Sequence, residues 1–516
     1  MTILLVSAMG VCLFAQSPKR EMRAVWVHTV NFSTWVSDVR VPAFDGTNEA
    51  EREAARTIQK NRIIDYFDAF QSVNLNAVFF HVRTTCDAFY KSKYEPWSHF
   101  LSTERGADPG WDPLQFAIEE AQKRGMELHA WLNPYRISFG EVQARAATSP
   151  LDYVNTHPEW VMAYNENVKI LNPGLPEVTQ RIADVVEDII TNYDVDGIVL
   201  DDYFYADNQR GLDNYAGKYF YLDSVLYYDY LAKNPLGRSQ ADWRRANCNG
   251  MVRAIYERIQ AVKPHVAFGM SPAGVAKGGA EDAGLNPSDI PAGDWQYTQI
   301  FCDPLAWMVQ LSVDYISPQI YWTTEHAVAP YGPLCEWWSQ TANRFGRYFY
   351  PSHAFSADVE DIGKQIDYNR KFDELGSPGM VVWDVQSFVN KGHLKYLSES
   401  RFRHKALPPA YSWKSAEEQG TVENLAVSGN VLSWTYGKEN VRYVVYAIPR
   451  EQRKNANLFS KSEYILGISY KKQFLLPSDI DANSHIAVSV LDRHGNESLP
   501  EISSSVRLST LRRRGK

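Results

Sequence analysis

The sequence predicts a (β/α)8 barrel followed by a small β-sandwich, and three observations support this prediction. First, short apolar runs with strand propensity alternate with amphipathic helical patterns from Arg23 to about Leu397. Second, there are eight such runs, which suits a closed barrel better than an open doubly wound sheet. Third, helical periodicity disappears after Pro408, and short alternating strands with closely spaced turn residues follow.

The predicted strands of the barrel each end in a polar or aromatic cluster. They are Ala24–Val30, Ala77–Val82, Glu127–Leu132, Gly197–Leu200, Ala267–Met270, Tyr315–Tyr321, Tyr348–Phe355 and Met380–Val385. Helical patterns between them include Asn61–Val73, Pro113–Arg124, Val178–Asn192, Asp242–Val262 and Asp361–Leu375. No glycine-rich phosphate loop follows the first strand, which argues against a dinucleotide-binding sheet.

Two connections are unusually long. The segment Ile137–Glu177 carries several Pro and Asn residues and one Trp, and Phe204–Asp242 carries seven tyrosines. Insertions that follow a barrel strand lie on the face formed by the carboxyl ends of the strands. We therefore expect both segments to shape a cleft on that face.

The C-terminal region has the pattern of a small β-sandwich. Its predicted strands are Thr421–Val427, Val431–Tyr436, Val441–Ile448 and Ile486–Asp492. Trp434 on the second strand and the two tyrosines of Tyr443–Tyr446 on the third resemble a fibronectin type III module. We expect the barrel over residues 20–400, a linker over 401–417, the sandwich over 418–507 and a solvated basic tail over 508–516.

The start of the chain indicates export. Thr2–Ala15 is an apolar run that ends in a small residue, as in a secretory signal with cleavage near Ala15, although no basic residue precedes it. The run is too short to span a bilayer, and no other stretch reaches about 18 apolar residues. We expect a signal peptide over residues 1–15, no membrane span, and a periplasmic or cell-envelope location.

Composition further narrows the class of protein. With 45% hydrophobic and 22% charged residues, the 516-residue chain is not a wholly disordered protein. A net charge of −8 argues against nucleic acid as the partner. The aromatic share of 13% is high, and aromatic rings fill cores but also stack on sugar rings in glycan clefts. We expect a monomer as the default.

The cysteines do not predict a metal site. Beyond the leader only Cys86, Cys248, Cys302 and Cys335 remain, and no two of them form a CxxC pair. Buried free thiols are at least as well supported as a disulfide, and the sequence cannot select a pairing.

Catalytic residues of such barrels come from the carboxyl ends of the strands, and polar or aromatic side chains stand at nearly every predicted end. His28 and Gln319 are among them. The residues that we expect to bind substrate are His81, Arg83, Trp131, Asn133, Tyr135, Arg136, Tyr203, Tyr321, Trp322, Trp383 and Asp384.

The most informative segment is DGIVLDDYFY, which runs from Asp196 to Tyr205. Burial of two adjacent carboxylates is unfavourable unless they are solvated, paired or used. Side chains alternate along a strand, and the bulky Ile198 and Leu200 should face the helices, so Asp201 should face the barrel mouth. Asp202 is either a second catalytic group or a structural one that holds Arg83, Arg136 or a backbone turn.

Hydrolysis of a glycosidic bond needs two carboxyl groups, one ionised and one protonated. We take Asp201 as the ionised member, acting as nucleophile or base. Asp87 is the first candidate for the proton donor, because burial in its aromatic setting, CDAFY, would raise its pKa. The alternatives are Glu95, Asp202, Glu325 and Asp384.

Other chemistries lack their motifs. The sequence contains no GxSxG elbow and no HExxH helix, its histidines are scattered, and Ser271 has no evident His–Asp pair. No metal or organic cofactor is expected, because glycosidic cleavage by two carboxyl groups needs none.

Several of these segments together resemble the glycosyl-hydrolase-like family 10 proteins, which are exported bacterial proteins. The segments are EMRAVWVHTV, HVRTTCDAFYKSKYEPWSHFLS, GWDPLQFAIEEAQKRGMELHAWLNPYR, DGIVLDDYFY, GMSPAGV, DYISPQIYW and GMVVWDV. The resemblance covers roughly residues 20 to 400. It implies a (β/α)8 glycosidase whose substrate class is the glycan strands of peptidoglycan, notably strands without stem peptides.

The resemblance also assigns residues. The family's acidic motif on strand four corresponds to Asp196, Asp201 and Asp202, its loop aspartate after strand two to Asp87, and its Asn-Pro-Tyr-Arg element to Asn133–Arg136. The spacing of Asp196 and Asp201 is also similar to strand four of α-amylase-type barrels, in which the second aspartate is the nucleophile. Two other hypotheses stay open: a hydrolase of another polysaccharide, and a non-catalytic glycan-binding protein on a degenerate barrel.

Overall fold

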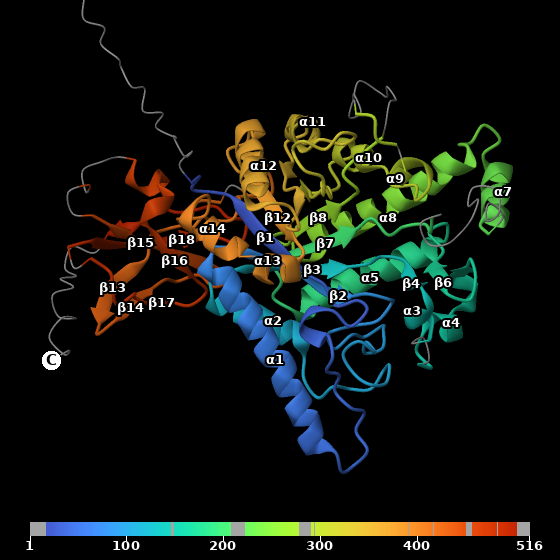
Figure 1. The fold of residues 1–516 in the computed structure, drawn as a ribbon, viewed down its shortest axis with the longest axis horizontal. Helices are drawn as coiled ribbons and strands as arrows, with labels where there is room; N and C mark the ends of the chain where they lie inside the picture. Colours follow the sequence, from blue (N-terminus) through green and yellow to red (C-terminus); the bar gives the residue numbers. More distant parts are fainter. Residues whose placement is uncertain are drawn as a thin grey trace, which may run out of the picture.

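The fold is that of a computed structural model, which describes residues 17–502 except 146–148, 208–221, 278–289, 294, 391, 416, 450–451, 453–456 and 482. The predicted leader and the predicted basic tail lie outside the described residues, as does part of the tyrosine-rich connection. Figure 1 shows a central barrel with its helices around it and a smaller C-terminal β domain at one side.

Parallel strands form the central sheet in the order β10-β9-β8-β7-β3-β2-β1-β12-β11. Their bounds are β1 Met22–Val27, β2 Ala77–Arg83, β3 Glu127–Leu132, β7 Gly197–Asp201, β8 Ala267–Ser271, β9 Tyr315–Ile316, β10 Tyr348–Phe349, β11 Ser352–Ala354 and β12 Gly379–Trp383. The ladder between β1 and β12 joins the first and last strands of the barrel.

The seventh strand of the barrel is interrupted. Only Tyr350 and Pro351 separate β10, which pairs with β9, from β11, which pairs with β12. The amide of Tyr350 donates to Ile316 at 2.9 Å, and the carbonyl of Pro351 accepts from Val381 at 2.9 Å. The ring therefore closes through this interrupted strand, and the predicted eight-stranded barrel is confirmed.

Helices cover the outside of the barrel. The longer ones are α1 Glu49–Ser72, α2 Pro113–Lys123, α5 Pro176–Asn192, α8 Gln240–Val262, α11 Tyr331–Arg344 and α12 Val359–Phe372. Shorter ones are α3 Glu141–Arg145, α4 Tyr153–Thr156, α7 Ser224–Lys233, α9 Trp295–Thr298, α10 Pro304–Val309, α13 Val385–Asn390 and α14 His393–Glu399. Helix α2 shows a local sequence signal: Asp112 accepts from the amide of Gln115, and Pro113 occupies the first helical position.

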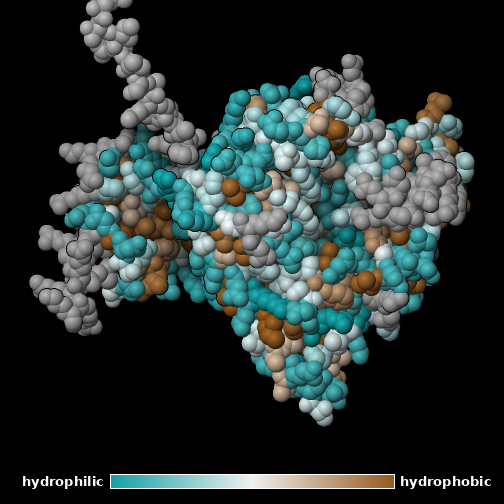
Figure 2. Space-filling model, in the orientation of Figure 1, coloured by the Kyte–Doolittle hydropathy of each residue, from teal (hydrophilic) through white to brown (hydrophobic). Residues whose placement is uncertain are grey.

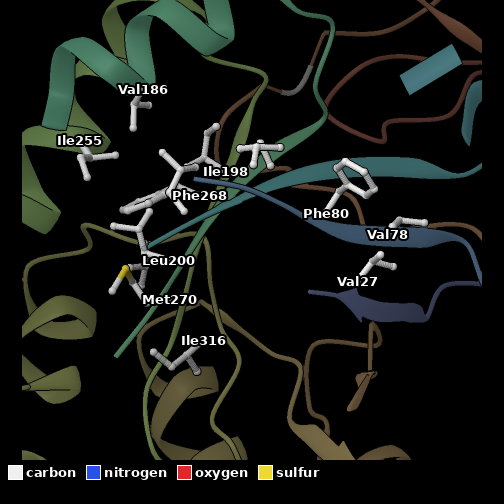
Figure 3. Packing of buried hydrophobic residues seen from close by; sticks show 14 of the residues in the cluster. Val27, Val78, Phe80, Val186, Ile198, Leu200, Ile255, Phe268, Met270 and Ile316 are labelled. Atoms are coloured by element: carbon white, nitrogen blue, oxygen red, sulfur yellow. The ribbon is translucent and has the colours of Figure 1, made fainter. Parts of the chain in front are cut away.

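The strands bury two different faces. In Figure 3, Ile198 and Leu200 of β7 lie with Phe268 of β8 toward Val186 of α5 and Ile255 of α8, which is the outer core. The inner core of the barrel has other members: Ala24, Trp26, Phe79, Trp131, Val199, Tyr315 and Val381. The predicted alternation along β7 is confirmed, because Val199 lies inside and its neighbours lie outside.

The connection after β3 forms a small antiparallel sheet. Its strands are β4 Arg136–Phe139, β5 Val161–Ala163 and β6 Val168–Leu171, in the order β4-β6-β5. In Figure 1 it lies beyond the arrowheads of β2 and β3, on the side of the carboxyl ends. This long connection therefore builds up one wall of the barrel mouth, as predicted.

The C-terminal region forms two antiparallel sheets, in the orders β13-β14-β17 and β16-β15-β18-β19. The strands are β13 Glu423–Ser428, β14 Val431–Thr435, β15 Arg442–Ile448, β16 Ile465–Ser469, β17 Gln473–Leu475, β18 His485–Leu491 and β19 Glu501–Ile502. Leu432 and Trp434 from one sheet pack with Val445 and Val488 from the other. A small β-sandwich is confirmed, and its likeness to a fibronectin type III module stays a prediction.

The sandwich contacts the amino ends of the barrel strands. Arg442 of β15 pairs with Glu127 at the start of β3, and Arg493 pairs with Asp196 just before β7 at 3.0 Å. Lys414, in the segment that leads into the sandwich, pairs with Asp314 before β9 at 2.7 Å. The end of the barrel opposite the mouth is thus closed by charged groups of the C-terminal region.

The thiols and the remaining surface give little information about function. Cys86, Cys248, Cys302 and Cys335 are buried and unpaired. Figure 2 shows a mainly hydrophilic face on which hydrophobic residues form small separate groups. Across the part of the chain that the structure describes, no helix combines the length and the apolar character that crossing a bilayer requires.

Candidate active site

Asp201 is the last residue of β7 and lies at the carboxyl end of the barrel, buried at 3% exposure. Its Oδ2 accepts a hydrogen bond from the indole N–H of Trp131 at 3.1 Å and another from the amide of Asn133 at 2.5 Å. Its Oδ1 is also buried, and none of the described residues bonds to it. One oxygen is therefore fixed by two donors while the other is left for an additional partner.

Burial raises the pKa of the Asp201 carboxyl to about 7; the nearby positive charge of Arg136 opposes the rise, and the like charge of Asp202 adds to it. The carboxyl is therefore protonated to a large extent near neutral pH. Both charge states are populated at this pKa, so the expectation that Asp201 is the ionised member of the pair stays a prediction. A carboxyl with such a pKa can give and recover a proton at neutral pH.

Asp202 is the second carboxyl at this strand end. Its Oδ1 accepts a hydrogen bond from the side-chain amide of Gln319 at 3.2 Å, and the same amide donates to the carbonyl of Ser271 at 3.1 Å. Gln319 follows β9, so strands β7, β8 and β9 together orient Asp202. Gln319 stands at a predicted strand end but was not among the residues expected to bind substrate.

Aromatic rings line the mouth beside these carboxyls. The imidazole of His81 stacks on Trp131 with 3.8 Å between ring centroids and 12° between planes. Tyr321 stacks on Trp383 at 6.0 Å and 18°, and both residues are half-buried. Because a pyranose presents flat apolar C–H faces, this half-buried pair offers a platform for a sugar ring.

Two histidines lie against these aromatic rings at the mouth. Burial, with Arg136 nearby, holds the pKa of His81 well below its usual range, and the described residues offer no hydrogen bond to either ring nitrogen. His28, at the end of β1, lies 5.2 Å from Trp383 between ring centroids, and burial lowers its pKa as well. Both imidazoles are therefore neutral polar groups near neutral pH. His28 is a second residue that the strand-end pattern contained and the prediction did not select.

Arg136 and Tyr203 form the charged side of the mouth. The guanidinium of Arg136 lies 4.7 Å from the centroid of the Tyr203 ring, and its Nε donates to the carbonyl of Thr84 at 2.9 Å. This fixed positive charge favours the ionised form of Asp201 and so limits how far burial raises its pKa. The expectation that Arg136 and Tyr203 lie at the site agrees with these positions.

Asp384 and Trp322 lie at other parts of the rim. Asp384 is half-buried after β12, and its Oδ1 accepts from the amide of Ser387 at 2.9 Å in the first turn of α13. Trp322 lies against Gly274, where an added Cβ would come within 2.7 Å of the indole. Strand β12 is four places from β7 around the ring, so Asp384 lies across the mouth from Asp201.

The structure contradicts the proton-donor role of Asp87. The carboxylate accepts hydrogen bonds from the hydroxyls of Thr84 and Thr85 at 2.7 and 3.1 Å and pairs with Arg105 at 3.1 Å. Burial alone would raise its pKa, but Arg105 and the hydrogen bonds outweigh burial and hold the pKa far below the usual range. Asp87 is an ionised structural group, and the expectation of a raised pKa is wrong.

Arg83 and Tyr135 are fully buried behind the mouth. The register of β2 on β3 shifts between His81 and Arg83, so that Arg83 pairs with the outward-facing Leu132. This irregularity turns Arg83 away from the barrel interior. Tyr135 belongs to the outer core and packs edge-on against Phe204. Neither side chain lines the mouth, contrary to expectation.

The other candidate proton donors differ in position. Both carboxylate oxygens of Glu95 accept hydrogen bonds from Arg83, at 2.8 and 2.6 Å, which makes Glu95 a buried structural partner. Glu325 is exposed in the loop after β9. Of the predicted carboxyls, Asp201 and Asp202 are thus the pair that one strand end brings together. No group of three or more His, Cys, Asp or Glu side chains that could hold a metal ion occurs among the described residues.

Comparison with known proteins gives the family. Residues 21–355 match the family described as glycosyl hydrolase-like 10. The chain belongs to this family. It is 32% identical over 505 residues to the glycosyl hydrolase YngK of Bacillus subtilis strain 168, covering 93% of this chain and 92% of YngK. It is also 32% identical over 398 residues to the glycosyl hydrolase DigH of Escherichia coli K12, covering 73% of this chain and 85% of DigH.

Membership in the glycosyl hydrolase-like 10 family makes the chain a glycoside hydrolase, as predicted. Among solved structures, the PgaB (BpsB) glycoside hydrolase domain from Bordetella bronchiseptica covers 73% of this chain and 98% of its own length, with 12% identity and a TM-score of 0.41. The catalytic β-amylase domain of Paenibacillus polymyxa gives 10% identity and a TM-score of 0.41, covering 74% of this chain and 99% of its own length.

Proposed function

We propose that this glycoside hydrolase cleaves glycosidic bonds in the glycan strands of peptidoglycan, in particular strands without stem peptides. The observation that carries the chemistry is the Asp201 carboxyl, with a pKa of about 7 and one buried oxygen that accepts no hydrogen bond from the described residues. The substrate class rests on the family resemblance. The half-buried Tyr321 and Trp383 and the neutral histidines beside them suit an N-acetylated sugar ring.

The hydrogen bonds of Asp201 decide where its proton sits. Because Oδ2 accepts from Trp131 and Asn133, the acidic proton belongs on Oδ1. In the proposed step this proton passes to the glycosidic oxygen as the bond from that oxygen to the anomeric carbon breaks. The two N–H donors and the nearby Arg136 then stabilise the carboxylate that is left.

Asp202 is proposed as the ionised partner. Its carboxylate is held by Gln319 at the same strand end, and its negative charge favours the protonated form of Asp201. A carboxylate in this position stabilises the positive charge that develops at the anomeric carbon. Water then adds to that carbon, and the proton it loses returns to the carboxyl pair, so both groups end in their starting state.

The test is a reducing-end and mass-spectrometric assay on peptidoglycan strands stripped of peptides by an amidase. Wild-type protein and Asp201→Asn are compared on these strands, on chitooligosaccharides and on α-glucans. Release from the stripped strands by the wild type alone would support both the substrate and the role of Asp201. Release only from another glycan would replace the substrate class. Binding without any release by the wild type would contradict hydrolysis.

We also propose that the protein works outside the cytoplasm, in the periplasm or at the cell envelope. The apolar segment Thr2–Ala15 supports this location. Fractionation of the producing cells, with sequencing of the mature N-terminus, checks it: a new N-terminus near Gln16 in the envelope fraction is expected. Full-length protein in the cytoplasm would contradict export.

A further inference from the structure

Arg83 lies behind the active site, and one residue connects it to Asp201. The Nε and Nη2 atoms of Arg83 donate to the two carboxylate oxygens of Glu95 at 2.8 and 2.6 Å. Its Nη1 donates to the carbonyls of Asn133 and Pro134, the latter at 2.9 Å. Both Arg83 and Glu95 are buried, and neither lines the mouth.

The turn that Arg83 holds is the turn that carries the Asn133 side chain. The side-chain amide of Asn133 donates to Oδ2 of Asp201 at 2.5 Å, while its backbone carbonyl accepts from Arg83. A second connection runs through Cys86, whose sulfur accepts from Arg83 at 3.3 Å and donates to the carbonyl of Arg136 at 3.4 Å. The buried arginine therefore reaches the backbone of two residues that act on the Asp201 carboxyl.

We propose that Arg83 is a positioning residue that, anchored by Glu95, holds the turn at Asn133 so that Asn133 fixes one oxygen of Asp201 and leaves the other for substrate. The inference rests on the proposed function, because it takes Asp201 as the proton donor. It also explains why the site has an arginine here: a planar guanidinium can reach a carboxylate and two carbonyls at once, whereas the single nitrogen of a lysine cannot.

The chain offers a matched control at the opposite end of the barrel. Arg23 of β1 is equally buried, pairs with the buried Glu21 at 2.7 Å and donates to the carbonyl of His404 at 2.6 Å. None of these groups contacts the mouth. Arg23→Lys and Arg83→Lys therefore both weaken a buried arginine network, and only Arg83→Lys disturbs a network that touches Asp201.

The experiment compares crystal structures, kcat, KM and pH profiles of the wild type, Arg83→Lys and Arg23→Lys, with peptide-free peptidoglycan strands as substrate. In Arg83→Lys we expect the distance from the Asn133 amide to Asp201 to exceed 3.5 Å. We expect kcat per folded molecule to fall about 10- to 100-fold with KM within about twofold, as for a misplaced catalytic group. Arg23→Lys is expected to keep the wild-type kcat and pH profile.

The pH profile separates positioning from a general loss of stability. The groups that act on the Asp201 carboxyl are Arg136, Asp202, Trp131, Asn133, the backbone N–H of Tyr203 and the hydroxyl of Tyr321. Loss of the Asn133 bond removes a donor that favours the carboxylate, so the upper pH limit of kcat should move to higher pH in Arg83→Lys. A merely structural role would leave this limit where it is.

The proposal is overturned if Asn133 keeps its bond to Asp201 in Arg83→Lys, or if the two lysine variants change kcat equally. If Arg83→Lys does not fold, Glu95→Gln serves for the same measurements, since it removes the charge that anchors Arg83 and keeps the shape. If the wild type cleaves none of the glycans, the proposed function fails, and the crystallographic distance still decides the positioning role.

Discussion

The two ends of strand β7 each hold a buried aspartate, and the surroundings of the two differ in one respect. Asp196, at the amino end, accepts from the amide of Leu128 at 2.9 Å through one oxygen and pairs with Arg493 at 3.0 Å through the other. Asp201, at the carboxyl end, has two donors on one oxygen and none from the described residues on the other. Burial raises the pKa of both carboxyls, and only at Asp196 does an arginine bond directly to the group to oppose the rise.

This difference indicates how a buried carboxyl that stabilises the fold can be distinguished from one that takes part in catalysis. At the amino ends of the strands, the carboxylates of Glu127, Asp196 and Asp314 each have a cation from the C-terminal region within 4 Å. At the carboxyl ends, Asp201 has an indole and an amide, both uncharged, as its side-chain hydrogen-bond donors. Paired carboxylates stabilise the fold, whereas an incompletely satisfied carboxyl remains available for proton transfer.

The strongest test of this comparison removes the acidic proton of Asp201. Asp201→Asn keeps the shape and the hydrogen bonds to Oδ2 but cannot donate an acidic proton. We expect kcat to fall about 10²- to 10⁴-fold, while the free energy of unfolding stays the same or increases because a buried carboxyl is replaced by a neutral amide. Reducing-end assays and chemical unfolding measure both quantities. Wild-type activity in this variant would move the proton donor to another residue.

The converse change removes a cation at the amino ends. Arg442→Ala leaves Glu127 buried without its closest cation, which should cost about 3 to 5 kcal/mol of unfolding free energy. The activity of the molecules that remain folded should not change, because Arg442 and Glu127 lie at the end away from the mouth. Denaturant unfolding checks the first expectation and kcat the second. An exposed pair makes the control: Lys438→Ala, opposite Glu417, should change stability by less than about 1 kcal/mol.

The pH dependence of stability gives a third contrast. The pKa of Asp201 is raised by folding from its usual value near 4 to about 7, so the folded protein binds an additional proton between these pH values. Stability from this group is fully present below about pH 4 and is lost as the pH rises through 7. Relative to Asp201→Asn, the wild type should therefore lose stability across this window. A parallel pH dependence of the two proteins would show that the Asp201 carboxyl is not protonated when buried.

The smallest expected effect concerns the aromatic platform. Trp383→Ala removes one half of the stacked pair with Tyr321, and each aromatic contact of this kind contributes about 0.5–1.5 kcal/mol. We expect KM to rise about 2- to 10-fold with kcat little changed. Trp413→Ala, in the segment between barrel and sandwich, removes an equally large ring far from the mouth. It should leave KM unchanged, and an equal rise in both variants would show that Trp383 does not bind sugar.

The sequence alone predicted the barrel, the sandwich and the Asp201–Asp202 strand end. These features depend on the periodicity and alternation of side chains, which are local patterns in the sequence. Sequence reasoning misassigned the surroundings of particular side chains. Asp87 looked like a desolvated acid, but Arg105, 18 residues later in sequence, bonds to it in the fold. Arg83 has the same parity as His81, yet the register shift in β2 turns it outward. The charge state of Asp201 likewise depends on how deeply neighbouring strands bury it, which the sequence does not encode locally.

The interruption at Pro351 has a consequence for how the barrel opens. Strands β9 and β10 share a ladder of two residue pairs, whereas the ladder between β2 and β3 has six. Because an eight-stranded ring has no free edge while it is closed, the first ladder to separate creates two edges at once. Native-state hydrogen exchange should therefore find its fastest barrel amides in β9 and β10, with the strands that carry Trp131 and Asp201 exchanging last. Strands β3 and β7 would then stay paired while the part of the ring formed by β9 and β10 opens and closes.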